Sequence, residues 1–377
     1  MEFLQAGSLD EALDLKAEYP GAVPIAGGTD VMVEINFDAR RPEALLDLTR
    51  VAELTAWGPA SAGHSAGHSG SHLRIGAGVS YVRLIGELGT LLPGLAMAAR
   101  TVGSPQIRNR GTIGGNLGAA SPAGDCHPML LASGAVIEAA SRRGTRQIPA
   151  AEFYVGPKRN ALEPDELITA VLLPRAPGPQ QFAKIGTRNA MVIAVCAFAL
   201  ELRPPHPENP THLVNPLHPV SPTPTTPTSV PMAPTGPLNA PDAAASDAVG
   251  AIGTPGPGPG PGPGPARGGS VGTGIGSAGP TPLRAAAAEE FLAGELAGRW
   301  ADSGPLPDAV AREFGALVAQ AARPIDDVRG TAAYRRHALS VLARRTLTWA
   351  WAAGFRGDGS PRWVEYAAGA SGEERCG

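Results

Sequence analysis

Two glycine-rich segments hold the residues of this chain whose types and spacing could do chemistry. The first, residues 26–30, reads AGGTD and follows a short apolar run, and the second, residues 112–116, reads TIGGN. Glycine lets the backbone adopt positive φ and approach a bound group closely, so successive N–H donors can converge on phosphate oxygens. A threonine hydroxyl adds a donor in each segment. The two segments therefore predict the two halves of one phosphate-binding cradle.

The spacing of the glycines argues against the two best-known phosphate loops. Neither segment reads G-x-x-x-x-G-K-[ST], the loop that binds nucleoside triphosphates. Neither reads G-x-G-x-x-G at the start of a helix behind a strand, the dinucleotide loop of Rossmann folds. Two separate loops fit a long ligand better than either of these arrangements.

Longer strings around the two segments carry a family resemblance. AGGTD at residues 26–30, SPQIRNRGTIGGNL at 104–117 and SPAGD at 121–125 occur in that order. With them the chain resembles the FAD-binding subunit of the molybdenum hydroxylases, the group that includes xanthine dehydrogenase and the medium chain of carbon monoxide dehydrogenase. Further strings match that family in order: EPDELI at 163–168, FAK at 182–184, GPTPLRA at 279–285 and PIDDVRG at 324–330. The resemblance covers roughly residues 1–202 and 277–355.

The resemblance implies an α+β fold in two parts. Residues 1–176 would form a two-part FAD-binding domain of the vanillyl-alcohol-oxidase/PCMH type. Residues 177–355 would form a C-terminal α+β domain, a small sheet packed with helices, typical of carbon monoxide dehydrogenase flavoproteins. A Pro/Gly-rich, disordered insertion at residues 203–270 would interrupt this second domain, and residues 356–377 would form a flexible tail.

The resemblance also implies an FAD site. Residues 25–30 would hold the pyrophosphate by backbone donors, and residues 112–116 would close on the same phosphates and the ribityl chain. Asp125 would accept from the adenosine end or fix the loop, Ile168 would contact a ring, and Lys184 would lie near the isoalloxazine or its phosphates. The full expected set is Pro24, Ile25, Ala26, Gly27, Gly28, Thr29, Asp30, Val31, Thr112, Ile113, Gly114, Gly115, Asn116, Asp125, Ile168 and Lys184. No catalytic or metal-binding residue is expected.

In that family a large subunit carries a molybdopterin cofactor, a small subunit carries two [2Fe–2S] clusters, and the medium subunit passes electrons to NAD, a quinone or another acceptor. We therefore expect the FAD-binding electron-transfer subunit of a molybdenum-containing hydroxylase or dehydrogenase. Cys126, Cys196 and Cys376 lie far apart in the sequence. They form no C-x-x-C pair, so an iron–sulfur cluster or zinc site held by this chain alone is not expected.

Composition sets the same frame independently. A length of 377 residues suffices for two domains with cores, and a net charge of −3 gives no electrostatic reason to expect nucleic acid or an anionic membrane. The N-terminus has no apolar signal region, and no stretch of about eighteen apolar residues occurs. We expect an enzyme subunit without a membrane span, in the cytoplasm.

The composition changes sharply over residues 203–270. This stretch holds about half of the 39 prolines and no aromatic residue, so it has little to bury and should not order. Residues 190–202 read as a buried strand, and residues 271–276 as the remnant of its partner. The stretch therefore looks like an overgrown hairpin loop, which is tolerated because closure entropy rises slowly with loop length.

The remaining patterns predict where the glycine segments lie. Ser8 and Glu11 form a capping box that opens a helix ended by residues 20–21, and residues 22–25 form a strand that leads into the first segment. Further elements are predicted as a strand over 73–79, helices over 81–88, 92–101 and 125–132, a strand over 135–140 and helical structure around 339–350.

Two other patterns and two other functions compete. His64, His68 and His72 are four apart, but the glycines and serines between them favour a hairpin tip over a metal-binding helix. Cys126 and His127 are neighbours in sequence, with no third group to orient them as a nucleophilic pair. The competing functions are a stand-alone FAD-dependent reductase or oxidase of the same broad fold, such as the enolpyruvyl reductase of cell-wall synthesis, and a non-enzymatic scaffold without cofactor.

Overall fold

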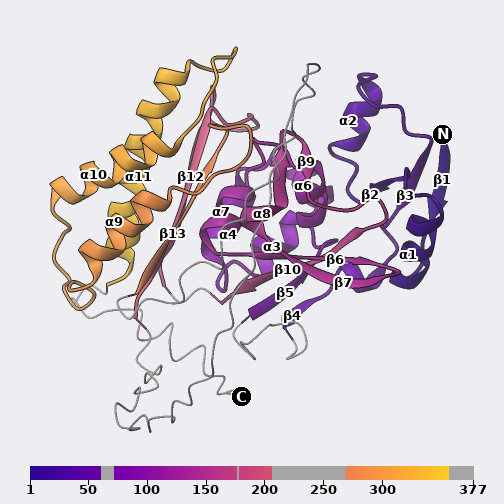
Figure 1. Ribbon diagram of the computed structural model, residues 1–377, viewed down its shortest axis with the longest axis horizontal. Coiled ribbons are helices and arrows are strands. Elements are labelled where there is room, and N and C mark those ends of the chain that lie inside the picture. Colours follow the sequence, from indigo (N-terminus) through magenta and orange to yellow (C-terminus); the bar gives the residue numbers. More distant parts are fainter. Residues whose placement is uncertain (61–71, 176–177, 206–268, 356–377) are drawn as a thin grey trace, which may run out of the picture. The chain divides into compact units, whose positions relative to one another are not determined.

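The computed structural model describes residues 1–60, 72–175, 178–205 and 269–355 (Figure 1). The predicted histidines at 64 and 68, most of the insertion, the C-terminal tail and Cys376 lie outside these ranges. The described residues mix helices and strands in the α+β manner expected from the sequence, with three sheets of three or more strands and one two-stranded sheet.

The first sheet is parallel and positions the first glycine segment. Its strands are β1 (Glu2–Gln5), β3 (Ala44–Asp47) and β2 (Val23–Ile25), in that spatial order. α1 (Leu9–Glu18) connects β1 to β2, and the capping box opens it as predicted. The Glu11 N–H donates to the Ser8 hydroxyl at 3.2 Å, and the Gly7 N–H donates to the Glu11 carboxylate at 2.7 Å. The glycine segment leaves β2 and runs into α2 (Val31–Asn36).

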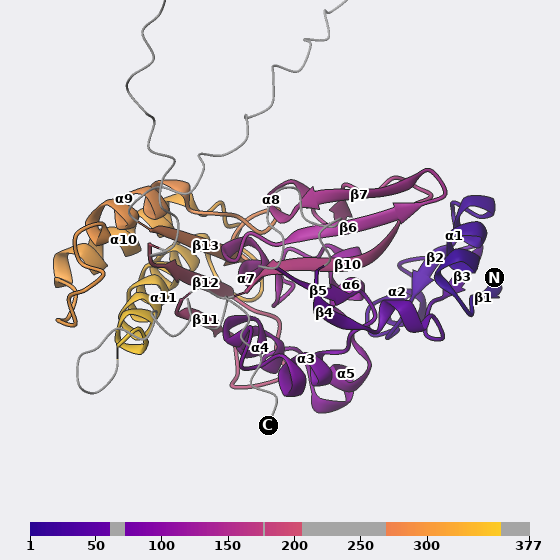
Figure 2. The same cartoon turned by 90° about the horizontal axis from the view of Figure 1, so that it is seen from below.

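The second sheet is antiparallel, in the order β4-β5-β10-β6-β7. Figure 2 shows β10, β6 and β7 side by side. Its strands are β4 (Trp57–Pro59), β5 (His72–Gly76), β10 (Leu167–Pro174), β6 (Val136–Ser141) and β7 (Gly144–Pro149). Five helices follow β5 along the chain: α3 (Tyr81–Glu87), α4 (Pro93–Arg100), α5 (Pro105–Arg110), α6 (Ile113–Ala119) and α7 (His127–Ala132). The short elements η1 (Ala52–Leu54), α8 (Ala150–Phe153), β8 (Tyr154–Gly156) and β9 (Arg159–Asn160) complete this part.

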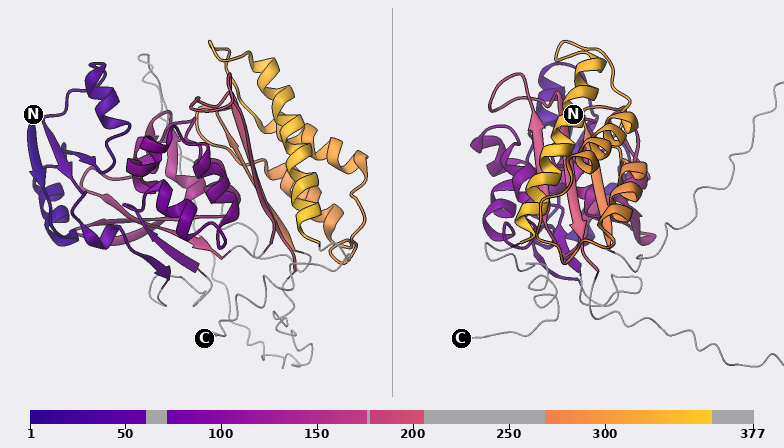
Figure 3. Two further views of the ribbon diagram at one scale, coloured as in Figure 1. Left: turned by 180° about the vertical axis from the view of Figure 1, so that it is seen from behind. Right: turned by 90° about the vertical axis from the view of Figure 1, so that its left-hand side faces the viewer.

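The third sheet lies between two sets of helices (Figure 3). β11 (Gln180–Ile185), β12 (Cys196–Arg203) and β13 (Ser270–Gly276) pair antiparallel. Helices α9 (Ala286–Leu296), α10 (Asp308–Ala321) and α11 (Ala332–Ala353) pack beside one another, with α9 and α11 in contact with the sheet, whereas α4 and α7 contact it on the side of the first two sheets.

Alternate glycines in β13 explain how α7 reaches this sheet. A Cβ on Gly272 would lie 1.9 Å from the carbonyl oxygen of Ala132, and a Cβ on Gly274 would lie 1.8 Å from that of Pro128. Because side chains on a strand alternate between faces, these glycines share one face. Their missing side chains let the backbone of α7 lie directly against the strand.

The structure confirms most predicted elements and corrects one strand. The predicted pairing across the insertion is confirmed, since Arg203 of β12 lies opposite Ser270 of β13. The insertion therefore begins after Arg203 and ends before Ser270, one residue inside each predicted limit. The strand predicted over 190–202 was wrong in its first part, because β12 begins only at Cys196. Met191 has a φ of 51°, which is incompatible with an extended strand.

Candidate cofactor site

A cavity of about 1070 Å³ lies where the two glycine segments meet. Both segments line it, together with residues 158–160, most of residues 162–168 and residues 191–193. Small-molecule sites usually occupy about 300–1,000 Å³, so this cavity is large enough for an extended dinucleotide-sized ligand.

Missing side chains bring the two segments together. A Cβ on Gly27 would lie 2.0 Å from the carbonyl oxygen of Arg110, so only glycine allows this approach. Gly28 has a φ of 74°, in the left-handed region that favours glycine. In the second segment a Cβ on Gly114 would lie 2.5 Å from the Cβ of Ala77, at the end of β5. The sequence thus folds into one cradle because glycine occupies each close contact.

The backbone donors of the two segments are used differently. In the described part of the chain, the N–H groups of residues 27–30 donate no hydrogen bond. In the second segment the Ile113 N–H donates to Val79 O at 3.1 Å, the Gly114 N–H to Ala77 O at 2.8 Å and the Gly115 N–H to Thr112 Oγ1 at 3.0 Å. The first segment therefore has the free donors that a pyrophosphate needs, whereas the second is internally satisfied.

Two residues that line the cavity have a buried acceptor oxygen without a partner among the described residues. Asn116 Oδ1 and Asp125 Oδ1 make no hydrogen bond with any described residue, and both residues line the cavity. A buried acceptor that lacks a donor costs free energy, so these oxygens suit a ligand that brings hydroxyl or N–H groups. Free N–H donors on one side and unfilled acceptors on the other match the phosphates and the hydroxyl and N–H groups of FAD.

Asp125 and Lys184 form an ion pair at the edge of the cavity. Lys184 Nζ lies 2.8 Å from Asp125 Oδ2 and also donates to Thr101 O at 3.2 Å. The two side chains are only 11% and 7% exposed. Burial raises the pKa of Asp125 to about 6, against the opposing effect of the lysine charge. Lys184 itself does not line the cavity and reaches it through Asp125.

The structure brings nearly all of the predicted site residues to this cavity. The exceptions are Ile25, Ile113 and Lys184. Ile113 is fully buried in the core at the start of α6. Ile25 is the last residue of β2 and does not line the cavity, although Val23, Pro24 and Ala26 do.

Sequence reasoning missed several stretches of the cavity wall, among them residues 20–23, most of 118–124 and residues 158–160. Lys158 lies in the turn between β8 and β9 with a φ of 54°, and residues 159–160 form β9. Most of residues 162–167 precede or begin β10, next to the predicted Ile168. Residues 191–193 lie in the loop that had been predicted as a strand. The Gly156-Pro157 pair was the one local signal for a turn here.

Cys126 and His127 are buried and do not line the cavity. Burial raises the pKa of the Cys126 thiol well above its usual value, which leaves it inert. Burial also lowers the pKa of His127 to about 4, despite two backbone carbonyls beside the ring.

The described residues that line the cavity include no cysteine or histidine, and the described chain holds no cluster of metal-binding side chains. No helix in the described ranges is long and apolar enough to cross a membrane.

Two family models match the chain. The model of the FAD binding domain in molybdopterin dehydrogenase matches residues 1–176. The model of the CO dehydrogenase flavoprotein C-terminal domain matches residues 267–350.

Curated relatives agree with the family models. The chain is 35% identical over 203 residues to the nicotinate dehydrogenase FAD-subunit of Eubacterium barkeri, over 52% of this chain and 66% of that protein. It is 34% identical over 206 residues to the putative xanthine dehydrogenase FAD-binding subunit of Escherichia coli K12, over 53% of this chain and 67% of that protein. The match thus spans slightly less than two thirds of the first relative.

Solved structures share the fold. Reconstituted CO dehydrogenase from Oligotropha carboxidovorans matches with a TM-score of 0.68 and 23% identity, over 94% of this chain and 98% of that one. Quinoline 2-oxidoreductase from Pseudomonas putida 86 matches with a TM-score of 0.67 and 20% identity, over 93% and 96%. Fold, cavity and relatives agree: the chain belongs to the FAD-binding subunits of the molybdenum hydroxylase family of oxidoreductases, and its cofactor is FAD.

Proposed function

We propose that this subunit passes electrons from the [2Fe–2S] clusters of a small partner subunit to NAD or another acceptor. A large partner subunit with a molybdopterin cofactor would oxidise the organic substrate. FAD can exchange electrons singly or in pairs, so it suits a position between one-electron clusters and a two-electron acceptor. The names of the relatives, which are the FAD subunit or medium chain of two dehydrogenases and the medium subunit of a hydroxylase, support this role.

The unused backbone donors of residues 27–30 carry the proposal. They would hold the pyrophosphate of FAD, with Thr29 adding its hydroxyl. On the other side, Asn116 Oδ1 and Asp125 Oδ1 would accept hydrogen bonds from hydroxyl or N–H groups. Because the N–H groups at the start of α6 are already bonded to Val79, Ala77 and Thr112, the second segment would act by packing and by side chains.

Lys184 would act through Asp125. The lysine charge orients the carboxylate by a 2.8 Å contact while Asp125 Oδ1 remains free to accept from a ring of the cofactor. The lysine cation beside Asp125 would also favour negative charge on a reduced flavin ring by electrostatic attraction.

We also propose the domain division 1–176 and 177–355, with the insertion between Arg203 and Ser270 inside the second domain. Two hydrophobic clusters support it. One joins the first two sheets with α3, α4, α6 and α7 and also takes in Phe182, Ala197 and Ala199 of the third sheet, and the other joins the third sheet with α9–α11. The net charge of −3 and the absence of a spanning helix from the described residues are compatible with the cytoplasm as the compartment.

Co-purification tests the proposal. The chain, expressed with the genes beside its own, should copurify with a molybdopterin-containing and a [2Fe–2S]-containing subunit and should carry one non-covalent FAD. Reduced clusters should then reduce the flavin. A chain that purifies without flavin, or whose flavin is not reduced by the clusters, would contradict the proposed function.

A further inference from the structure

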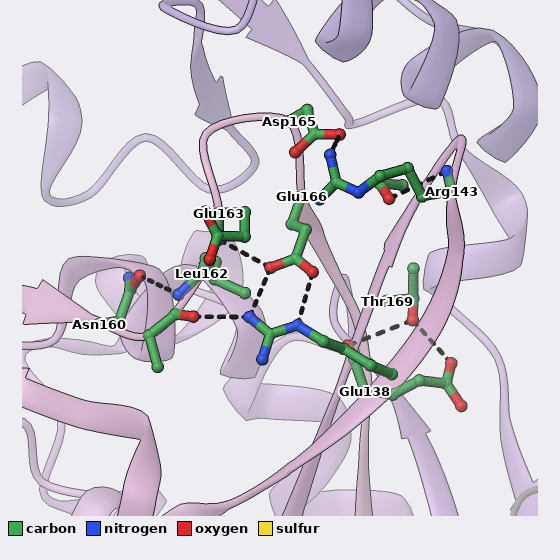
Figure 4. A network of polar contacts seen from close by, with 11 residues as sticks. Glu138, Arg143, Asn160, Leu162, Glu163, Asp165, Glu166 and Thr169 are labelled. Atoms are coloured by element: carbon green, nitrogen blue, oxygen red, sulfur yellow. Dashed lines mark hydrogen bonds and ion pairs between the residues drawn. The ribbon is translucent and has the colours of Figure 1, made fainter.

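A braced segment forms one wall of the cofactor cavity. Residues 160–168 connect β9 to β10, and most of them line the cavity. Figure 4 shows the polar contacts that surround this segment. The segment contains no helix and only the ends of two strands, so its shape must come from these contacts rather than from regular secondary structure.

Arg146 of β7 binds Glu166 in a two-point contact. Its Nε lies 2.6 Å from Glu166 Oε1, and its Nη2 lies 2.8 Å from Glu166 Oε2. Nη2 also donates to Ala161 O at 2.7 Å, so one guanidinium ties both ends of the segment. The Glu166 side chain is only 4% exposed, and the bond to Arg146 holds its pKa below the usual value.

The Glu166 carboxylate also shapes the segment from within. The Glu163 N–H donates to Glu166 Oε2 at 2.7 Å, and the Glu166 N–H donates to Glu163 O at 3.0 Å. At the other end Asn160 Oδ1 accepts from the Leu162 N–H, and its amide donates to Gly118 O at 3.0 Å. Gly118 belongs to α6, so the segment is fixed to the helix of the second glycine segment.

A β-bulge directly follows Ile168 in β10. Ile168 pairs with Ala139 whereas Ala170 pairs with Glu138, which leaves Thr169 as the extra residue. The Thr169 hydroxyl donates to Glu138 Oε1 at 2.7 Å, and its carbonyl accepts from the Ala77 N–H at 2.9 Å. Bulges re-aim neighbouring side chains. Ile168 thus sits between two polar anchors, Glu166 and Thr169, and lines the cavity.

A second ion pair on the same elements provides a comparison. Arg143, in the turn between β6 and β7, contacts Asp165 of the same segment. The Arg143 side chain is 62% exposed, and it makes no two-point contact with the carboxylate. Exposed pairs of this kind contribute little. The two-point pair beside it, in which Arg146 is 45% exposed but Glu166 is buried, therefore carries the bracing.

The two ends of the cavity differ in chemistry. Near residues 160–168 two buried charged groups are already bound: Glu166 by Arg146, and Lys16 of α1 by the carbonyls of Pro20 and Ala22 at 2.7 Å each. Burial lowers the pKa of Lys16, and the nearby Asp165 charge opposes that shift. Leu162, Pro164, Leu167 and Ile168 also line the cavity at this end, so it offers apolar contacts for a ring.

The other end carries the free Asp125 oxygen and an exposed surface. Met191 and Ile193 line the cavity from the loop after β11, the strand that carries the Lys184 partner of Asp125, and they are 55% and 53% exposed. A redox ring has to lie where an electron-transfer partner can approach it. The isoalloxazine therefore belongs at the Asp125 end, which leaves the braced segment for the adenosine half.

We propose that Arg146 and Glu166 are positioning residues that hold residues 160–168 in the shape that receives the adenosine half of FAD. The inference rests on the proposed FAD site. Arg146 touches no ligand in this account. It fixes Glu166, which fixes the turn at Glu163, and together with the Thr169 bulge the turn presents Ile168 to the cavity.

Affinities of the deflavinated protein for FAD and for ADP test this inference. ADP carries the adenosine and the pyrophosphate but no flavin, so it probes one half of the site. The variants are Arg146→Met and Glu166→Gln, with Arg146→Lys as the conservative change and Arg143→Met as the matched control. Dissociation constants and the melting temperature of each apoprotein are measured.

We expect the dissociation constants of Arg146→Met for FAD and for ADP to rise by the same factor, about tenfold, as for loss of a charge-assisted contact. Glu166→Gln should raise the dissociation constants for both ligands by a similar factor. The dissociation constants of Arg146→Lys should lie between those of Arg146→Met and wild type, because lysine cannot form the two-point contact. Arg143→Met should bind both ligands like wild type.

Unchanged affinities in Arg146→Met and Glu166→Gln would overturn the inference, even if the melting temperature falls. So would an equal loss in Arg143→Met, or a loss for FAD without a loss for ADP. If Arg146→Met does not fold, Glu166→Gln decides alone. Absence of FAD binding by the wild-type chain would instead refute the proposed function, so the two failures are distinguishable.

Discussion

Gly114 and Gly115 are neighbours in sequence but meet different surroundings. A Cβ on Gly114 would lie 2.5 Å from Ala77 Cβ and 2.7 Å from its carbonyl oxygen. A Cβ on Gly115 would have one close neighbour, the Thr112 hydroxyl at 3.1 Å, and otherwise space at the cavity. Gly114 therefore serves the packing of α6 on the turn after β5, whereas Gly115 leaves open the space in which we propose that the ligand binds.

Replacing Gly115 by valine should abolish FAD retention while the protein still folds. The new side chain would occupy ligand space, but it would meet little protein. Absorbance at the flavin bands and the melting temperature of the apoprotein check the two halves of this prediction.

Gly114→Val should behave differently, because its side chain would enter the packed turn at Ala77. We expect a loss of about 3 kcal/mol in the free energy of unfolding, typical of overpacking. Gly86→Ala in α3, where an added Cβ would meet nothing within 4 Å, is the control and should change neither property. Full flavin occupancy in Gly115→Val would show that the cavity is not the FAD site.

His127 ties together two stretches of the cavity wall. Its Nδ1 lies 3.0 Å from Ser121 O, and its Nε2 lies 3.1 Å from Asn116 O. A neutral ring can donate to only one of these carbonyls, yet burial lowers the pKa of His127 to about 4 and keeps it neutral. The folded protein therefore loses stability when the solution becomes acidic, because the unfolded chain can protonate this histidine more easily.

His127 should make stability fall with pH in a defined window. Its folded pKa of about 4 lies below the ordinary value of 6.5, so the unfolded chain binds the proton first. The contribution of the neutral His127 ring to the free energy of unfolding is complete above pH 6.5 and is lost as the pH falls toward 4. Relative to His127→Gln, the wild type should lose about 2 kcal/mol between pH 7 and pH 5.

Urea unfolding of both proteins at each pH measures this difference. The comparison is needed because the raised pKa of Asp125 acts in the opposite direction, with stability lost as the pH rises from 3.8 to about 6. Asp125 is present in both proteins, so its effect cancels in the difference. A difference that does not vary with pH would contradict the assigned state of His127.

At the scale of elements, the long connection between β12 and β13 separates two strands that pair to their ends. Arg203 and Ser270 are direct partners, and Arg203 also contacts the buried Glu201 and the carbonyl of Ala132. The pairing of the strands therefore needs only a short turn at this point.

Replacement of residues 204–269 by a two-residue Asn-Gly turn should leave FAD content unchanged. Such turns match the twist of paired strands. Loop closure should become cheaper, by about 3 kcal/mol for an ideal flexible loop. Flavin absorbance and a thermal melt check this prediction, and loss of FAD or of a cooperative melt would mean that the connection contributes to the fold.

Local sequence patterns predicted most helices and strands, because capping hydrogen bonds and apolar periodicity act between residues close in sequence. The capping box at Ser8 and Glu11 opens α1 through hydrogen bonds within four residues. The strand that leads into the first glycine segment and the pairing of β12 with β13 also follow from local apolar runs. Residues 190–195 have the same apolar character as β12, but they precede the strand, and residues 191–193 line the cavity. That role depends on distant parts of the chain.

The glycine segments of the site could be predicted for the same reason, since each close contact demands glycine at a fixed place. The ion pair of Asp125 with Lys184 could not be predicted from the sequence, because β11 and the turn that holds Asp125 meet only in the folded protein. The brace by Arg146 was equally hidden, since an arginine in an exposed strand usually signals only solvent.

At the scale of the whole molecule, this chain holds the cofactor site but no metal cluster among its described residues. Purified alone, it should bind FAD and show at most slow reduction of artificial acceptors. It should not oxidise purines, aldehydes or carbon monoxide until the large and small subunits are added. Turnover of such a substrate by the isolated chain would favour a stand-alone flavoenzyme over the electron-transfer subunit.

The most direct test of the central claim compares two assembled complexes, one with the wild-type chain and one with Gly115→Val, by stopped-flow absorbance. After addition of the substrate that the large subunit oxidises, the [2Fe–2S] clusters should become reduced in both complexes. Only the wild type should then transfer electrons to NAD or its other acceptor, because only it retains flavin. Equal rates of acceptor reduction by a flavin-free complex would contradict the account.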